Sequence, residues 1–597
     1  MNNDIIRMGD DMEYINGNDL YQMFNYGTYY INKERVYLND INVFPVADGD
    51  TGNNLLSTLK AIVLESKKDD SFSKTLDSIS NSALIGARGN SGVIFAQFVN
   101  GLQKANGSSD KITIEEFAAL VVESYKHTHA SLSNPVEGTM LTIIREWGEQ
   151  LLEFTKHDTS LKEVFSATLK SIKLVLLKTK KMLNVLTDND VVDSGAMGFV
   201  LFVEGIVSYY NNDDINVTDY EEIELKDNHH FEGEITHRYC TEGLVKYEDF
   251  NEPKLRNTLE AFGDSLIIAE GKERFRVHVH TNTPELVFEK LNDYGIIESQ
   301  KIDDMMMEMK LKNSSSKRVL VTDSIADLDP DFLDQNEIVV IPINITLDSI
   351  PYLDKLSINN KLLFDNLNSY LEYPKTATPS IKYINDLFSK LLLQFDEIIV
   401  VTVSEQLSGT HNVIKNEAKK LTDKGKKIFV VDSYNNSATE GLIVQKARQL
   451  MTEKLPTNEI ISKLEEYREK TQILVCLETF KYAMMSGRLP KVVGKIGMLF
   501  GLRPIMSLNK GKGAAYGMAL SQKGITKKIV KLVQKDLEQT GIDSYSLVHC
   551  ENEKLALEYK VLFTTLIGKE PEFVSEISSA TAIHSGVGSV AIGYIKK

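Results

Sequence analysis

The chain has 597 residues, of which 42% are hydrophobic and 25% charged, and its formal net charge is −17. This length suggests about three or four domains, each large enough to bury a core of its own. The acidic balance disfavours nucleic acid and an anionic membrane surface as partners held by long-range attraction, and it leaves a local basic cleft open.

Cysteine usage and the apolar stretches indicate a cytoplasmic protein. Cys240, Cys476 and Cys550 form no CxxC motif and no disulfide framework, which suits a reducing compartment. The N-terminal stretch "MNNDIIRMGDD" lacks the apolar region of a signal peptide. The longest apolar stretch, "GAMGFVLFVEGIV", is interrupted by Glu204 and is too short to span a bilayer, so we expect no transmembrane segment.

Residues 1–210 are expected to form an all-helical domain. The stretches "SGVIFAQFVNGLQKA", "TIEEFAALVVESYKHTHASL" and "SLKEVFSATLKSIKLVLLKT" repeat apolar residues at helical spacing. The loops between them carry glycine-rich motifs. The acidic stretch "NNDDINVTDYEEIELKDNHHFEGE" then reads as a linker.

Two further domains are expected after this linker. The sequence pattern of residues 233–311 predicts a small α+β domain, with strands in "HRYCTEGLVKY" and "RFRVHVHTN" and a helix in "ELVFEKLNDYG". After a second linker, "LKNSSSK", residues 317–597 alternate short β-branched runs such as "KRVLVTDS", "KKIFVVDS", "QILVCLET" and "SYSLVHCEN" with helices. That alternation predicts an α/β domain with a parallel sheet.

The motif "DGDTGNN" places two carboxylates, Asp48 and Asp50, on either side of Gly49. Carboxylates two residues apart in a turn can converge on Mg²⁺, and the N–H groups of the following residues suit phosphate if a helix begins there. A solvated Asp-Gly turn explains the same residues. "GARGNSG" and "VVDSGAMG" are two more such turns, each of which also suits a plain helix cap. Three of them on one helical scaffold favour a phosphate site.

The stretches "NVFPVADGDTGNN", "GARGNSGVIFAQF", "EGTMLTIIRE" and "VVDSGAMGF" resemble the ATP-binding domain of bacterial fatty acid kinase, a DhaL- or DAK2-type domain related to the nucleotide-binding part of dihydroxyacetone kinase. The resemblance implies a helical barrel in which Asp48 and Asp50 hold Mg²⁺. In dihydroxyacetone kinase, one more carboxylate precedes this pair, at a position where this chain has Val43 beside Asn42. The residues that the resemblance implies at the nucleotide are Thr51, Gly52, Asn53, Asn54, Asn90, Ser91, Gly92, Gly138, Thr139, Asp193, Ser194 and Gly195.

In the middle domain, "RVHVHTN" puts His278 and His280 on one face of a strand, because side chains alternate with a period of two. Two imidazoles with Cys240 as a third ligand would suit zinc. A polar strand face with a buried thiol is the alternative. "RYCTEGLV" and "RVHVHTNTP" resemble the middle domain of fatty acid kinase, which implies that Cys240, His278 and His280 are site or catalytic residues.

In the last domain, apolar strands run into hydroxyl-rich turns, which suit either an anion or helix capping. "VTDSIADL", "TATPS", "LSGTHNV", "GRLPKVVGKIGMLFGLRPI" and "HSGVGSVAIGYI" resemble the DegV family of fatty-acid-binding proteins. The resemblance implies two α/β lobes around an acyl chain. The residues that it implies at the carboxylate or the mouth of the site are Thr376, Thr378, Ser408, Gly409, His584, Arg488 and Arg503.

Together these resemblances predict a fatty acid kinase fused to its lipid-binding partner, which uses ATP and Mg²⁺ to make an acyl phosphate. They imply a long-chain fatty acid as substrate, a homodimer, and a downstream acyltransferase that feeds phospholipid synthesis. Two alternatives stay open. One is a non-catalytic fatty-acid carrier or sensor regulated by ATP, and the other is a kinase of a small hydroxyketone such as dihydroxyacetone.

Overall fold

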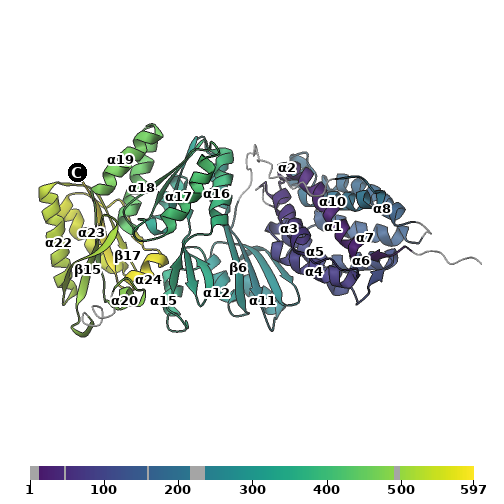
Figure 1. Cartoon of the computed structure of the whole chain (residues 1–597), viewed down its shortest axis with the longest axis horizontal. Coiled ribbons are helices and arrows are strands. Elements are labelled where there is room, and N and C mark those ends of the chain that lie inside the picture. The colour runs from purple at the N-terminus through teal and green to yellow at the C-terminus, as the bar shows by residue number, and fades with distance from the viewer. Residues whose placement is uncertain (1–12, 46, 48, 157–159, 216–234, 490–497) are drawn as a thin grey trace, which may run out of the picture. The chain divides into compact units, whose positions relative to one another are not determined.

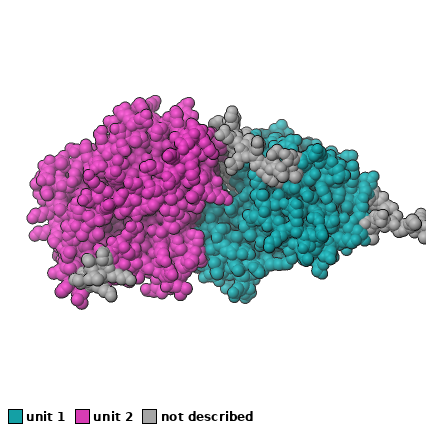
Figure 2. Space-filling view, in the orientation of Figure 1, with its two compact units in different colours: residues 1–309 teal, residues 310–597 magenta. Residues whose placement is uncertain are grey.

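The structure of the chain is a computed structural model that describes residues 13–45, 47, 49–156, 160–215, 235–489 and 498–597. It divides into two compact units, unit 1 (Met1–Met309) and unit 2 (Lys310–Lys597), which are drawn in teal and magenta in Figure 2. The expected helical and middle domains therefore fold together as unit 1. The first expected linker lies almost wholly outside the described residues.

The first part of unit 1 is helical, as expected, apart from the short antiparallel pair β1 (Ile15–Asn16) and β2 (Lys111–Ile112). Side-chain caps on Asn16, Thr113 and Ser160 start three of its helices. The helices, all labelled in Figure 1 except α9, are α1 (Gly17–Lys33), α2 (Arg35–Asp40), α3 (Thr51–Glu65), α4 (Phe72–Gly86), α5 (Gly89–Ala105), α6 (Ile114–Ala130), α7 (Met140–Phe154), α8 (Leu161–Thr179), α9 (Asn184–Asp188) and α10 (Ser194–Asn211).

Aromatic side chains fill the centre of this helical domain. Phe95 of α5 packs edge-on against Phe24 of α1 and Phe202 of α10, with ring centroids 6.3 and 5.1 Å apart. Helices α1 and α10 approach each other closely because Gly27 and Gly205 face each other, and a Cβ on Gly205 would collide with the Gly27 backbone. The helices therefore converge on a packed apolar core, and the polar turns are left at their ends.

The middle part of unit 1 is α+β, as expected. Its four strands form one antiparallel sheet in the order β4-β5-β3-β6. The pairing register of β3 with β5 sets Cys240 opposite His280 and Glu242 opposite His278. The elements are β3 (Tyr239–Lys246), α11 (Glu252–Leu259), β4 (Gly263–Glu270), β5 (Arg274–Thr281), α12 (Pro284–Leu291), β6 (Ile296–Asp304) and α13 (Met305–Lys312).

Unit 2 is α/β. Its first sheet has the order β13-β12-β7-β8 and is parallel, as expected, and a small antiparallel sheet β10-β9-β11 lies in the same part of the chain. The elements are β7 (Arg318–Asp323), η1 (Ser324–Ala326), α14 (Pro330–Gln335), β8 (Ile338–Ile341), β9 (Asn344–Leu347), β10 (Ile350–Leu353), α15 (Asn360–Asp365), β11 (Lys375–Ala377), α16 (Ile381–Gln394), β12 (Glu397–Thr402), α17 (Thr410–Thr422), β13 (Ile428–Asp432), α18 (Ser437–Thr452) and α19 (Thr457–Glu469).

The second sheet of unit 2 has the order β16-β15-β14-β19-β17-β18. The expectation of a parallel sheet is wrong for "QILVCLET", because β14 pairs antiparallel with both β15 and β19. It holds only in part for "SYSLVHCEN", because β17 pairs parallel with β18 but antiparallel with β19, which returns between β14 and β17. A buried apolar strand has the same composition in either direction. The elements are β14 (Thr471–Cys476), α20 (Lys481–Met485), β15 (Arg503–Asn509), β16 (Lys512–Ala519), α22 (Gln522–Gln539), β17 (Ile542–His549), α23 (Glu553–Ile567), β18 (Val574–Glu576), α24 (Ser579–Ser585) and β19 (Val590–Lys596).

Candidate functional site

Asp50 immediately precedes helix α3 and begins the candidate nucleotide site; Asp48 lies outside the described residues. Within the described chain, the Asp50 side chain accepts no capping hydrogen bond from α3, so its carboxylate remains available to a cation. Two N–H groups of the first turn, those of Gly52 and Asn53, donate to Oδ1 of Asn39 at 2.8 and 3.3 Å. A phosphate would reach these two groups only after Asn39 moves.

The second glycine-rich turn lies against the first. Thr51 Oγ1 and Ser91 Oγ are 3.3 Å apart, and Thr51 also donates to the amide oxygen of Asn42. Gly89 begins α5 with φ of +56°, a conformation that L side chains rarely adopt. A Cβ on Gly89 would also collide with the side chain of Asn54. The glycine is therefore required both by its backbone angle and by the close approach of the two turns.

The third turn completes the cluster. Oδ1 of Asp193, the N-cap of α10, accepts from the N–H of Ala196 at 2.7 Å, and the carboxyl also accepts from the N–H of Met140 at the start of α7. Ser194 Oγ donates to the carbonyl oxygen of Leu38 in α2 at 2.6 Å. Burial raises the pKa of Asp193 to about 7, even though both hydrogen bonds oppose this shift.

The structure thus joins the ends of α2, α3, α5, α7 and α10 in one group, which we call the polar turn cluster. It consists of Asn39, Asn42, Asp50–Asn54, Gly89–Gly92, Gly138–Thr139 and Asp193–Gly195. Its side chains offer carboxylate, hydroxyl and amide oxygens, which are the ligand atoms that Mg²⁺ prefers. Asn42 stands beside the position where the dihydroxyacetone kinase pattern has its third carboxylate, and its oxygen faces Thr51.

The middle sheet carries a second cluster. The ligand atoms of Cys240, His278 and His280 lie within 4.8 Å of one another, and all three residues are buried. Cys240 Sγ is 3.8 Å from His278 Nδ1, and the two imidazole rings are 5.1 Å apart. Among the described residues, no hydrogen-bond partner reaches the buried Nε2 of His278. A thiol and two imidazoles, one of which has an orphaned ring nitrogen, could hold a metal ion such as zinc.

Local electrostatics favour the uncharged forms of Cys240 and His280. Burial raises the pKa of the Cys240 thiol well above its usual value, and the charges of Glu242, Asp303 and Asp50 add to this effect. Burial and the neighbouring His278 lower the pKa of His280 to about 3. The contribution of Asp50 means that the Cys/His cluster and the polar turn cluster are electrostatic neighbours.

Glu242, which the sequence motifs did not single out, contacts both of these clusters, and Arg276, which they also missed, pairs with it. Both are fully buried, and their charged groups are 3.3 Å apart. Arg276 donates to the carbonyl oxygens of Leu84 and Ile85 at the end of α4. The period-two alternation that identified His278 and His280 also includes Arg276, and Glu242 stands two residues after Cys240 on the same strand face.

We expect the purified chain to carry about one zinc ion in the middle sheet, because a thiolate and two imidazoles make a strong site. Cys240→Ser should lose most of this metal. Cys550→Ser, which changes a buried cysteine in unit 2, should retain it. Metal analysis by mass spectrometry after gel filtration measures the content, and a folded wild-type chain with no metal would contradict the expectation.

In unit 2 the structure brings several of the expected carboxylate residues together. A Cβ on Gly409, just before α17, would lie 3.3 Å from Cγ2 of Thr378, so the two loops are in contact. Ser408 Oγ is 2.9 Å from Thr410 Oγ1. Arg488 donates to the carbonyl oxygen of Leu407 at 3.0 Å, next to Ser408.

His584 of α24 belongs to the same neighbourhood. Burial, and then the positive charge of Arg488, lower the pKa of His584 to about 4, so its imidazole is neutral at physiological pH. Its Nδ1 is buried, and among the described residues nothing hydrogen-bonds to it. Thr376 lies on β11 opposite Ile345. Arg503 instead makes an ion pair with Glu478 and donates to Gln522 at 3.0 Å.

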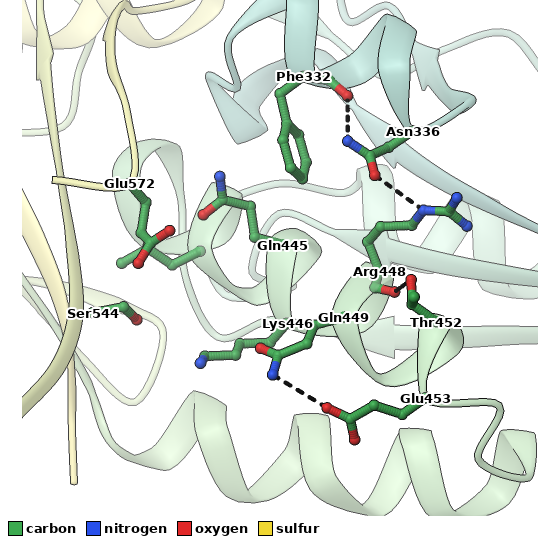
Figure 3. A pocket seen from close by; sticks show the side chains of 11 residues that line it. Phe332, Asn336, Gln445, Lys446, Arg448, Gln449, Thr452, Glu453, Ser544 and Glu572 are labelled. Atoms are coloured by element: carbon green, nitrogen blue, oxygen red, sulfur yellow. Dashed lines mark hydrogen bonds between the residues drawn. The ribbon is translucent and has the colours of Figure 1, made fainter.

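A separate groove of about 430 Å³ lies on unit 2 between α14, α18 and β17 (Figure 3). None of the expected site residues lines it. Several of its polar side chains bond to one another: Arg448 Nε donates to Asn336 at 3.2 Å, and Gln449 donates to Glu453 at 3.2 Å. The groove is therefore not part of the sites described above.

Comparisons with known proteins match three successive ranges of the chain. Residues 45–208 match the DAK2 domain, residues 236–311 the FakA-like middle domain of fatty acid kinase, and residues 317–597 the uncharacterised DegV family. An uncharacterised protein of Mycoplasma genitalium is 34% identical over 337 residues, which are 52% of this chain and 60% of that protein. An uncharacterised protein of Staphylococcus saprophyticus is 28% identical over 305 residues, 49% of this chain and 55% of that protein. The chain thus spans little more than half the length of these relatives.

Other matches concern the DegV part. A DegV domain-containing protein of Clostridium acetobutylicum is 29% identical over 289 residues, which cover 47% of this chain and 99% of that protein. Among solved structures, a DegV family protein of Thermus thermophilus, described as fatty acid binding, has a TM-score of 0.44 at 24% identity and covers 47% of this chain and all of its own. DegV of Bacillus subtilis, described as a fatty acid binding protein, has a TM-score of 0.42 at 21% identity. This match covers 47% of this chain and all of that protein. None of the described helices is long and apolar enough to cross a membrane.

Proposed function

We propose that this chain, which combines a DAK2 domain, a FakA-like middle domain and a DegV domain, is a fatty acid kinase with its lipid-binding part attached. The reaction joins a carboxylate oxygen of the fatty acid to the terminal phosphorus of ATP and breaks the bond from that phosphorus to ADP. The presence of the three domains in one chain carries the proposal. The polar turn cluster supports it.

The polar turn cluster would bind the nucleotide. Asp48 and Asp50 would hold Mg²⁺, with the oxygens of Asn42 and Ser91 nearby. Mg²⁺ neutralises negative charge on transferring phosphates. Thr51, Thr139 and the N–H groups that follow Gly89 in the first turn of α5 and that begin α10 would orient the phosphates, since helix N-termini attract anions. The N–H of Gly89 itself donates to Glu242. Asp193, with a pKa of about 7, is partly protonated at neutral pH and can donate a hydrogen bond.

In unit 2, Thr378, Ser408 and His584 would orient the fatty acid carboxylate. This nucleophile is already ionised at neutral pH, so the reaction needs no strong general base. The neutral His584 can donate one hydrogen bond, and Arg488 supplies positive charge. Each buried CH₂ of an acyl chain contributes roughly 0.8 kcal/mol, so a long chain can be bound firmly enough to leave water.

Fusion of the two functions has a kinetic consequence. A short flexible tether gives an effective concentration of about 1 mM between two modules. The DegV part then need not find its kinase by diffusion, although it cannot diffuse freely to a downstream acyltransferase. Transfer within one chain and transfer between two chains of a homodimer are both compatible with this proposal.

Acyl-phosphate formation tests the proposal directly. Purified chain, Mg²⁺, ATP and oleate are incubated with hydroxylamine, which converts an acyl phosphate to a hydroxamate that can be measured. We expect hydroxamate that depends on both ATP and oleate. ATP consumption with dihydroxyacetone and none with oleate would favour the small-substrate kinase. Oleate binding without any ATP turnover would favour the carrier or sensor.

A further inference from the structure

Glu242 is a fully buried carboxylate that the proposed phosphoryl transfer does not use. It lies on β3 of the middle sheet, two residues after Cys240, and its side chain reaches the first residue of α5. Its carboxyl group faces the guanidinium groups of Arg276 and Arg88, which fit a charged carboxylate in spite of its burial.

The two oxygens of Glu242 have different partners. Oε1 accepts from the N–H of Gly89 at 2.5 Å and lies 3.4 Å from Nδ1 of His278. Oε2 faces two guanidinium groups, that of Arg276 at 3.3 Å and that of Arg88 at 3.7 Å. One oxygen thus contacts both the glycine-rich turn and a residue of the Cys/His cluster, and the other anchors the carboxylate.

Each contact of Oε1 has a clear consequence. Gly89 has a positive φ and begins the turn that carries Ser91, so a fixed partner for its N–H restricts the turn to one shape. Metal-binding histidines commonly donate their second ring nitrogen to a carboxylate, which fixes the orientation of the ring. Glu242 occupies that position for His278, whose other nitrogen, Nε2, is unpartnered among the described residues.

We propose that Glu242 is a positioning residue that couples a metal ion at Cys240, His278 and His280 to nucleotide binding at the polar turn cluster. A metal ion on His278 fixes the ring, the ring fixes Glu242, and Glu242 holds Gly89. The turn is then already ordered before the nucleotide arrives, so less conformational entropy is lost when the nucleotide binds. The inference rests on the proposed function only in taking the polar turn cluster as the nucleotide site.

The test measures binding without turnover. Full-length chain is stripped of metal and then reloaded with Zn²⁺ held at a fixed free concentration by a chelating buffer. The affinity for ADP with Mg²⁺ is measured by calorimetry in both states. Couplings between sites typically correspond to about 5–150-fold, and we expect zinc to tighten ADP binding at least about fivefold. By linkage, ADP must tighten zinc binding by the same factor.

Variants of Glu242 test whether this residue carries the coupling between zinc and ADP binding. Glu242→Gln removes the negative charge that Arg276 and Arg88 anchor, and its NH₂ group must face either these guanidinium groups or the N–H of Gly89. The zinc-dependent change in ADP affinity should therefore fall toward a factor of one. Glu242→Asp keeps the charge opposite Arg276 but is shorter, so it gives the same readout if the glutamine variant does not fold. Glu298→Gln removes the 2.7 Å ion pair with Arg274 on the same sheet and should keep the wild-type factor.

Two results would overturn the inference: zinc leaves ADP affinity unchanged in the wild-type chain, or the wild-type factor persists in both Glu242 variants. A chain that makes no acyl hydroxamate but shows the coupling would refute the proposed function alone. An active kinase without the coupling would refute this inference alone.

Discussion

The double substitution Asp48→Ala/Asp50→Ala is expected to lower acyl-phosphate formation by at least about 10³-fold, because charges that neutralise a transferring phosphoryl group contribute about 10³–10⁵ in rate. The substitution removes the two carboxylates of the "DGD" motif, which precedes α3 in the sequence. The measurement is the initial rate of hydroxamate formation from ATP and oleate at saturating Mg²⁺.

The same variant separates nucleotide chemistry from fatty acid binding. Oleate binding to the double variant, measured by lipid extraction and mass spectrometry, should equal that of the wild-type chain. Asp188→Ala removes an exposed carboxylate at the end of α9 and serves as the matched control. If the double variant retained even a tenth of the wild-type rate, the assignment of these aspartates to Mg²⁺ would fail.

The double substitution Ser408→Ala/His584→Ala should weaken oleate binding at least about 10²-fold, since each hydrogen bond to a charged group contributes roughly 1.5–3 kcal/mol. Both residues lie near Arg488, which bonds to the backbone beside Ser408 and lowers the pKa of His584. Titration with a fluorescent fatty acid, displaced by oleate, measures the affinity.

The effect should appear in the KM for oleate, and ADP affinity should stay unchanged. Ser369→Ala removes an exposed hydroxyl of unit 2 and is the control. Wild-type oleate affinity in the double variant would move the carboxylate site elsewhere in unit 2. Arg503, whose guanidinium is already paired with Glu478, should then be tested next.

Local rules account for what the sequence predicted well. Apolar residues at helical spacing gave the helical first segment, and short β-branched runs gave the strands of the middle and last segments. His278 and His280 share a face because they are two residues apart in one strand, and no other part of the chain is needed for that inference. The glycine-rich motifs were recognisable as turns from their glycine and polar residues. In the structure they lie at the starts of α3, α5 and α10.

The direction of strands in unit 2 was beyond the reach of such rules. The strands β14 and β17 have the apolar composition of buried parallel strands, yet each pairs antiparallel with β19. Hydrogen bonds of the ladder are satisfied in both directions, and buried side chains are apolar in both. The choice depends on where the last strand of the chain inserts, which is a non-local event.

By itself, then, the sequence determined the three segments, the positions of the turns and the pairing of His278 with His280 on one face. The tertiary structure alone decided that Cys240 faces His280, that Asn42 faces Thr51 and that Glu242 joins the Cys/His cluster to Gly89. These contacts link residues 9 to 153 positions apart. They follow from strand register and from the packing of the middle sheet on α4 and α5, since a carboxylate buried there must find donors wherever the fold supplies them.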